Sequence, residues 1–138
     1  MSVPENERTV GRLDVNTKAL NLCVYTLRIT ANPKVFIQDQ DAFTQKIRDV
    51  ATDIHLLCWE ANNVNVGKSM ERYKTRIELQ ARAIDKCNSL CALIEIAKPL
   101  YHLATRRVVF WTDRTVKLRE MIINWKNSDI KRLKPTEV

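Results

Sequence analysis

The chain has 138 residues, of which 45% are hydrophobic and 28% are charged, and its formal net charge is +7. This length fits one domain with a core of its own. The chain has only two glycines, Gly11 and Gly67, and this scarcity argues against sheets with glycine-dependent turns, so we expect an all-α fold. No apolar run approaches the ~20 residues of a membrane span, and residues 1–8 are too polar for a signal peptide. We therefore expect a cytoplasmic protein.

The polar residues 1–12, which include Pro4 and Gly11, are predicted to form a flexible N-terminal arm. The first helix is expected to begin within residues 13–16 and to end before Pro33, which disfavours helix at the residue before it. Its apolar residues recur at the spacing of one helix face: Leu13, Leu20, Val24, Leu27 and Ala31.

A second helix is expected after Asp39 or Asp41, either of which can cap it. Its apolar residues alternate at three and four positions, as in a helix packed nearly antiparallel to its neighbours: Phe43, Ile47, Val50, Ile54, Leu57, Ala61 and Val64. Gly67 is the predicted C-terminal stop.

The third helix is predicted to start at Ser69, and Pro99 is expected to kink or end it. A turn is expected within residues 100–106. The third helix carries two neighbouring apolar stripes, wide enough to contact two partners: one of Tyr73, Ile77, Ile84, Cys87, Cys91 and Ile94, and one of Leu79, Ala83, Leu90, Leu93 and Ala97.

Thr105 can cap a fourth helix that is predicted to run to Trp125 or Lys126. Residues 13–127 then form an up-down-up-down antiparallel four-helix bundle, and residues 128–138 form a basic C-terminal tail. The apolar stripe of the fourth helix has the same three-four spacing: Val108, Trp111, Leu118, Ile122 and Trp125, with Thr115 between them.

The four cysteines, Cys23, Cys58, Cys87 and Cys91, each lie among apolar residues. Reduced cysteine packs as a small hydrophobe, and disulfides are rare in the cytosol. A metal site using His55 with these thiols is the alternative, but the paired loop spacing of structural zinc sites is missing. Core packing is therefore the preferred interpretation.

Positive charge is concentrated at the C-terminal end of the chain. Residues 98–138 hold ten Lys or Arg against four acidic residues, whereas residues 1–97 hold thirteen against twelve. Such a cluster attracts a polyanion, and nucleic acid and an acidic protein surface both fit. The predicted contact residues are Lys98, Arg106, Arg107, Phe110, Arg114, Lys117, Lys126, Lys131, Arg132 and Lys134.

Three aromatic residues lie near this basic segment. Trp111 and Trp125 share the apolar stripe and are expected in the core or at a subunit interface, whereas Phe110 lies off the stripe and is the candidate for an exposed contact with a base. The sequence has no glycine-rich phosphate loop, His-Glu-x-x-His motif or nucleophile elbow. We therefore expect no enzymatic activity and no cofactor or metal.

The helix ends carry a resemblance to a known family: a first helix ending before Pro33-Lys34, a second carrying Arg48 and ending at Ala61-Asn62, a third finishing in Ile96-Ala97-Lys98, and a fourth finishing in Trp125. Over residues 13–130 the chain resembles the bacterial and phage four-helix-bundle proteins. These include the proteins encoded in 23S ribosomal RNA intervening sequences and the accessory variability determinant (Avd) of diversity-generating retroelements.

The resemblance implies a ring-like homopentamer of four-helix bundles with a basic surface. In the retroelement branch it also implies binding of a reverse transcriptase and its template RNA, in support of mutagenic cDNA synthesis. The basic surface corresponds here to Arg106, Arg107, Arg114, Lys117 and the lysines of the tail. The alternative is a structural interaction module of the intervening-sequence type, whose basic face meets an acidic protein.

Overall fold

Four helices make up the part of the chain that the computed structural model describes, which is residues 5–37 and 41–133, with side chains from Asp14 onward. This part contains no strand, so the all-α prediction is confirmed. Within it, no helix combines the length and the apolar character that a membrane crossing requires. The helices are α1 (Glu5–Ala31), α2 (Asp41–Asn63), α3 (Met70–Tyr101) and α4 (Thr105–Leu133).

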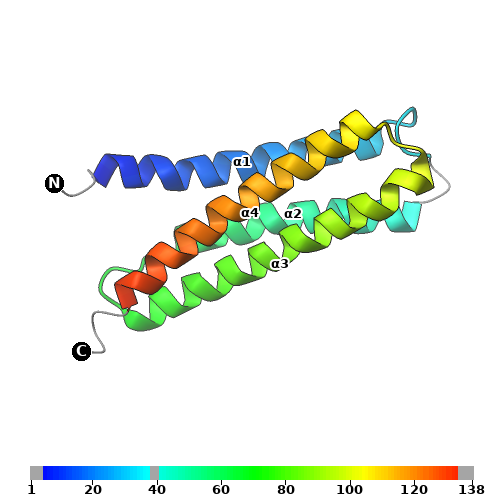
Figure 1. Cartoon of the computed structure of the whole chain (residues 1–138). Helices are drawn as coiled ribbons and strands as arrows, with labels where there is room; N and C mark the ends of the chain where they lie inside the picture. Colours follow the sequence, from blue (N-terminus) through cyan, green and yellow to red (C-terminus); the bar gives the residue numbers. More distant parts are fainter. Residues whose placement is uncertain (1–4, 38–40, 134–138) are drawn as a thin grey trace.

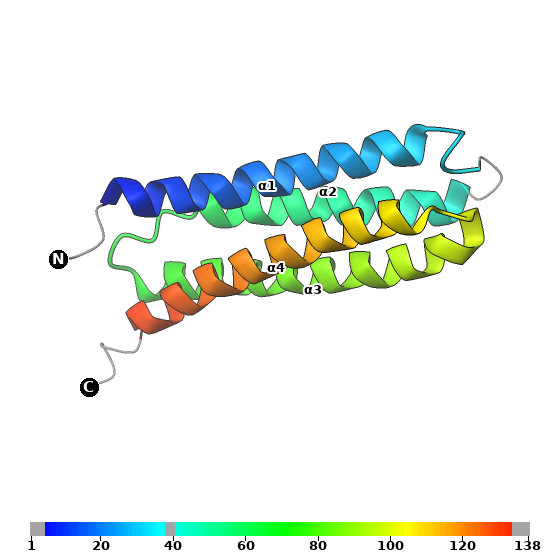
Figure 2. The same cartoon turned by 45° about the horizontal axis from the view of Figure 1, so that its top comes forward.

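The four helices lie side by side, consistent with a four-helix bundle. Each helix packs against the next one in the chain, and α1 also packs against α4. Figures 1 and 2 show that α4 starts near the end of α1 and then diverges from it, approaching the far end of α3. The helices α1 and α4 are therefore nearest to each other around the start of α4 and farther apart toward its end (Figures 1 and 2).

Trp111 of α4 lies in the middle of the core and is fully buried. Its indole Nε1 donates a hydrogen bond to Thr26 Oγ1 at 3.0 Å, and its ring meets that of Phe36 edge-on at 6.1 Å. Phe36 in turn stacks at a tilt on Tyr101, with ring centroids 4.5 Å apart. Burying each large apolar side chain is worth roughly 1.5–3 kcal/mol, so these rings contribute strongly to holding α1, α3 and α4 together.

The predicted stripes of α2 and α4 lie in the core, but the stripe predicted for the first helix was wrong. Leu20 and Ala31 are exposed, and the buried face of α1 includes Thr26 and Thr30, which a pattern of apolar residues alone does not identify. On α2 the buried residues include Ile47, Ile54, Leu57 and Ala61, and on α4 they include Trp111, Leu118 and Ile122. Trp125 is half-buried and packs against the same cluster. The prediction that Trp111 belongs to the core is confirmed.

The helix ends follow the local sequence signals closely at α3. Ser69 is its N-cap and accepts a hydrogen bond from the backbone N–H of Arg72. Pro99 lies in the last turn, and α3 ends at Tyr101, after which His102 adopts a left-handed conformation with φ of 56°. Gly67 does not directly follow α2, which ends at Asn63, but it has φ of +50° in the turn that leads to α3.

Two predicted boundaries were wrong. Helix α1 begins at Glu5, so residues 5–12 are helical and do not form an arm. Helix α4 continues to Leu133, because Asp129 is fixed to α3 by buried hydrogen bonds. Residues 1–4, Asp39 and the remainder of the predicted tail, 134–138, lie outside the described residues.

The cysteines are free, and three of them are buried, which confirms core packing for Cys23, Cys58 and Cys87. Burial raises the pKa of the Cys58 thiol to about 12, and it raises the pKa of Cys87 as well. Half-buried Cys91 also has a raised pKa through burial, opposed by the charge of Arg119. The thiols of Cys58, Cys87 and Cys91 are therefore neutral near pH 7. Within residues 5–37 and 41–133, no three His, Cys, Asp or Glu side chains form a group that could hold a metal ion.

Candidate nucleic-acid interface

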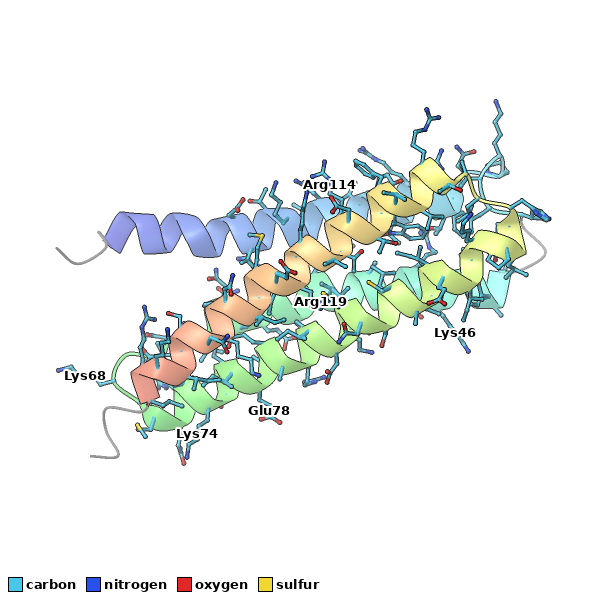
Figure 3. All side chains as sticks on the ribbon, viewed as in Figure 1. Lys46, Lys68, Lys74, Glu78, Arg114 and Arg119 are labelled. Carbon is cyan, nitrogen blue, oxygen red and sulfur yellow. The ribbon has the colours of Figure 1, made fainter. Side chains whose placement is uncertain are left out.

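One face of α4 gathers half of the predicted contact residues. At about 100° per residue, the positions of these five side chains span less than a third of the helix circumference. That face points toward α1, and Figure 3 shows Arg114 on it, while Arg119 lies on the side of α4 toward α3. The residues brought together are Arg106, Arg107, Phe110, Arg114 and Lys117.

Helix α1 completes this surface with residues that the sequence did not single out. Lys18, Asn21 and Tyr25 line a hollow of about 330 Å³ between α1 and α4, opposite Phe110 and Arg114. A second hollow, of about 230 Å³, lies between Tyr25 and the start of α4. Tyr25 and Phe110 line both hollows, so the two form one continuous surface, which we call the α1–α4 groove: Lys18, Asn21, Leu22, Tyr25, Ala104, Arg106, Arg107, Phe110, Arg114, Lys117, Leu118 and Met121.

The floor of the α1–α4 groove is aromatic. The rings of Tyr25 and Phe110 are 5.2 Å apart, and Tyr25 also meets the buried Trp111 edge-on at 6.2 Å. The Arg114 guanidinium lies over Phe110, 4.7 Å from the ring centroid. Phe110 is 43% exposed, as its position off the apolar stripe predicted. Its contacts with Tyr25 and Arg114 hold it at the surface in a fixed place.

The groove is positively charged because most of its cations have no acidic partner among the described residues. Five cations line it, and among the described residues no carboxylate does. Lys117 pairs with Asp113 at 2.9 Å, but both side chains are exposed, so water and salt weaken this pair. Lys18, Arg106, Arg107 and Arg114 have no ion pair within the described part of the chain. The groove therefore presents a positive field to solvent.

The other predicted contact residues lie elsewhere. Lys98 is in the last turn of α3, and its Nζ donates to Thr105 Oγ1 at 3.2 Å. Lys126 lies half a turn around α4 from Lys117, and so on the opposite side of the helix. Lys131 is exposed near the end of α4, and Arg132 bonds to Asp129 at 3.4 Å. Lys134 lies outside the described residues.

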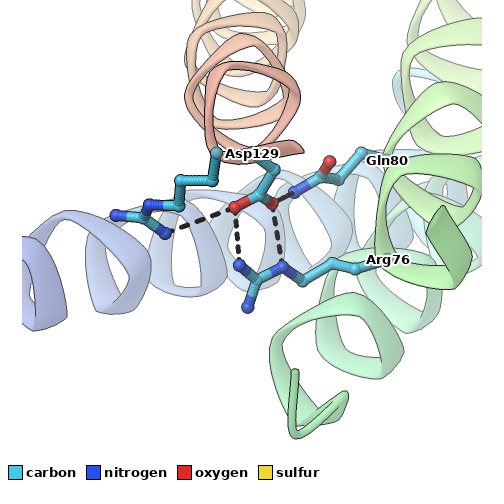
Figure 4. A network of polar contacts seen from close by, with 4 residues as sticks. Arg76, Gln80 and Asp129 are labelled. Carbon is cyan, nitrogen blue, oxygen red and sulfur yellow. Dashed lines mark hydrogen bonds and ion pairs between the residues drawn. The ribbon is translucent and has the colours of Figure 1, made fainter. Parts of the chain in front are cut away.

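A buried polar network between α3 and α4 had no counterpart in the sequence interpretation (Figure 4). Arg76 Nε and Nη2 donate to the two carboxylate oxygens of Asp129 at 2.8 and 2.6 Å, and Gln80 Nε2 donates to Asp129 Oδ2 at 2.8 Å. The Arg76 and Asp129 side chains are only 1% and 0% exposed. The Arg76 guanidinium also lies over the rings of Tyr73 and Trp125, 5.3 and 5.7 Å from their centroids. The Arg76 guanidinium is therefore part of the core and does not contribute to the positively charged surface.

The comparisons with known proteins add no assignment. No family model matches the chain, and no curated protein or solved structure matches it either. The resemblance to the four-helix-bundle proteins therefore stays a prediction.

Proposed function

We propose that the protein is a non-enzymatic nucleic-acid-binding accessory protein that holds its ligand in the α1–α4 groove. The observation that carries the proposal is the set of five cations around an exposed aromatic ring, with no carboxylate among the described residues that line the groove. Phosphates neutralise such a set and release counterions, while an exposed ring offers a stacking surface to bases. The two features together fit nucleic acid better than they fit a carboxylate-rich protein.

The test is the salt dependence of binding to a fluorescent structured RNA, measured by anisotropy. At ~50 mM salt we expect clear binding, and a few phosphate contacts predict a loss of affinity of about a hundredfold or more by ~200 mM. The triple variant R106E/R107E/R114E should abolish binding at both salt concentrations. Absence of binding by the unaltered protein at ~50 mM would overturn the proposal.

A matched control separates the groove from net charge. Lys46, Lys68 and Lys74 are exposed and lie on α2, in the α2–α3 connection and on α3, away from the groove (Figure 3). The variant K46E/K68E/K74E changes the net charge by the same amount as the groove variant. It should lose much less affinity, and equal losses in the two variants would show that the groove has no special role.

The family resemblance extends this proposal to assembly and partner. We propose an up-down-up-down bundle that assembles into a ring-like homopentamer and supports a reverse transcriptase on its template RNA. Exposed apolar residues one turn apart on α2, Leu56 at 47% and Trp59 at 54%, support a contact between protein subunits. Light scattering should give a mass of five chains, and a monomer would contradict the ring.

The alternative is a protein interaction module of the intervening-sequence type. The same five cations attract a carboxylate-rich protein surface, and α2 adds an apolar contact. This alternative predicts that the freshly purified protein has the ultraviolet absorbance ratio of pure protein and carries a specific acidic partner. Co-purified nucleic acid that the R106E/R107E/R114E variant loses would favour the first proposal.

A further inference from the structure

The α1–α4 groove differs from a surface that only neutralises phosphates. Its larger hollow has an apolar interior of Leu22, Tyr25, Phe110, Leu118 and Met121, with the cations Lys18, Arg114 and Lys117 around it. Its volume of about 330 Å³ falls within the range of pockets that enclose small organic ligands. A ligand that fills the hollow must therefore present both a flat apolar group and an anion.

A nucleic-acid duplex presents only part of that chemistry. Its bases are stacked inside, so a duplex lying on the groove would contact Arg114 and Lys117 through phosphates and leave Phe110 exposed. In a single strand the bases are free to unstack, and each has a face that can lie on an aromatic ring or on a guanidinium plane. The fit to the groove is therefore better for an unpaired base than for a base pair.

The stacking surface is already in place in the structure. Phe110 rests against Tyr25 at 5.2 Å and carries the Arg114 guanidinium at 4.7 Å, so ring and cation form a short stack at the mouth of the hollow. Tyr25 in turn is braced by the fully buried Trp111. Little side-chain ordering is needed on binding, which favours affinity.

We infer that the α1–α4 groove selects single-stranded nucleic acid, taking one unpaired base against Phe110 and Arg114 while Lys18 and Lys117 contact the phosphates beside it. This inference rests on the proposed function, since it names which form of nucleic acid the groove takes. The selection is by strandedness and is not a reading of base sequence, because every base has a π-face.

The experiment compares three ligands of equal length, about 12 nucleotides, which lies within the site sizes of single-strand binders. They are a single strand, the matching blunt duplex, and an abasic strand that has the same phosphates but no bases. At ~50 mM salt the single strand should bind at least about fivefold more tightly than either of the others, since stacking of one base is worth about 1–3 kcal/mol.

The variant Phe110→Ala should weaken single-strand binding by at least about fivefold and leave the abasic strand and the duplex unchanged. Phe110→Trp should retain single-strand binding, because it keeps an aromatic face. The matched control is Val109→Ala, which removes a neighbouring side chain that is 61% exposed and outside both hollows. It should change none of the three affinities.

A second readout locates the base directly. A strand with a single photoreactive 5-iodouracil should cross-link to Phe110 or Tyr25, as identified by mass spectrometry of the adduct. Equal affinity for all three ligands, no effect of Phe110→Ala, or cross-links confined to other helices would each overturn the inference and leave the proposed function intact. Failure of all three ligands to bind at ~50 mM salt would instead overturn the proposed function.

Discussion

On the side of α4 that faces α3, a charged pair is enclosed, whereas on the side that faces α1 most of the cations have no ion pair among the described residues. Asp129 is held by Arg76 and Gln80 in the interior, while Arg106 and Arg114 stand at the rim of a hollow. Hydrogen bonds from Arg76, Gln80 and Arg132 to Asp129 offset the desolvation of the enclosed pair, although Arg76 Nη1 is buried without a partner among the described residues. The rim cations keep their hydration and need no partner. The charges on one side of α4 thus serve the fold, and those on the other are free to meet a ligand.

The largest expected loss of stability comes from removing one member of the buried ion pair between α3 and α4. Asp129→Ala leaves the Arg76 guanidinium buried without its carboxylate, and we expect a loss of about 3–5 kcal/mol in the free energy of unfolding. Urea denaturation followed by circular dichroism measures this loss. The control is Asp113→Ala, which removes the exposed partner of Lys117 and should change stability by no more than about 0.5 kcal/mol.

A smaller loss of stability is expected from breaking the hydrogen bond between Thr26 of α1 and Trp111 of α4. Thr26→Val keeps the shape of the side chain but removes the acceptor for the Trp111 indole N–H, leaving a buried donor unpaired. The expected loss is about 1–3 kcal/mol in the same denaturation experiment. A loss as large as that of Asp129→Ala would show that the two sides of α4 are equally dependent on polar contacts.

The buried thiol of Cys58 makes the free energy of unfolding depend on pH. Burial raises the pKa of Cys58 from 9.0 to about 12, so between these values the unfolded chain ionises this thiol and the folded protein does not. The contribution of this thiol to the free energy of unfolding is fully present below pH 9, and it is lost as the pH rises above 9 because only the unfolded chain ionises there. We expect a loss of about 1 kcal/mol between pH 8 and pH 10.

The comparison that isolates this thiol is Cys58→Ala, measured over the same pH interval. The variant is less stable at every pH because it leaves a small cavity, but its stability should fall by about 1 kcal/mol less than that of the unaltered protein. The same fall in both proteins would mean that other groups cause the pH dependence.

The smallest effect on stability is expected at the rim of the groove. Arg107→Ala and Arg114→Ala remove cations that have no ion pair within the described residues, so the free energy of unfolding should change by no more than about 0.5 kcal/mol. Both variants should nevertheless weaken nucleic-acid binding and lower its salt dependence, since each phosphate contact contributes to the slope. A strong destabilisation by Arg114→Ala would assign this residue to the fold.

Much of the fold was accessible to sequence reasoning because it depends on short-range periodicity. The three-four spacing identified the core faces of α2 and α4, and the same arithmetic separated buried Trp111 from exposed Phe110. Arg106, Arg114 and Lys117 were predicted as contact residues from the charge of residues 98–138, and the structure places them on one face of α4.

The other features of the fold and of the candidate site depended on tertiary contacts between helices. Lys18 and Tyr25 belong to the candidate site only because α1 lies beside α4, and nothing in their local sequence indicates that. Asp129 was interpreted as the start of a tail, since its partner Arg76 lies 53 residues earlier and an Arg–Asp pair that far apart has no periodic signature. The nucleic acid, the pentamer and the family stay predictions.

The hydrogen bond between Thr26 and Trp111 joins residues 85 positions apart, a wider separation than in the Arg76–Asp129 pair. Loop-closure entropy grows with the length of chain enclosed, so the first helix meets the last at a greater entropic cost than neighbouring helices meet each other. In native-state hydrogen exchange, amides along this seam should open at a lower free energy than those between α3 and α4. A ligand bridging α1 and α4 would slow that opening, so exchange protection along the seam would report occupancy without any label.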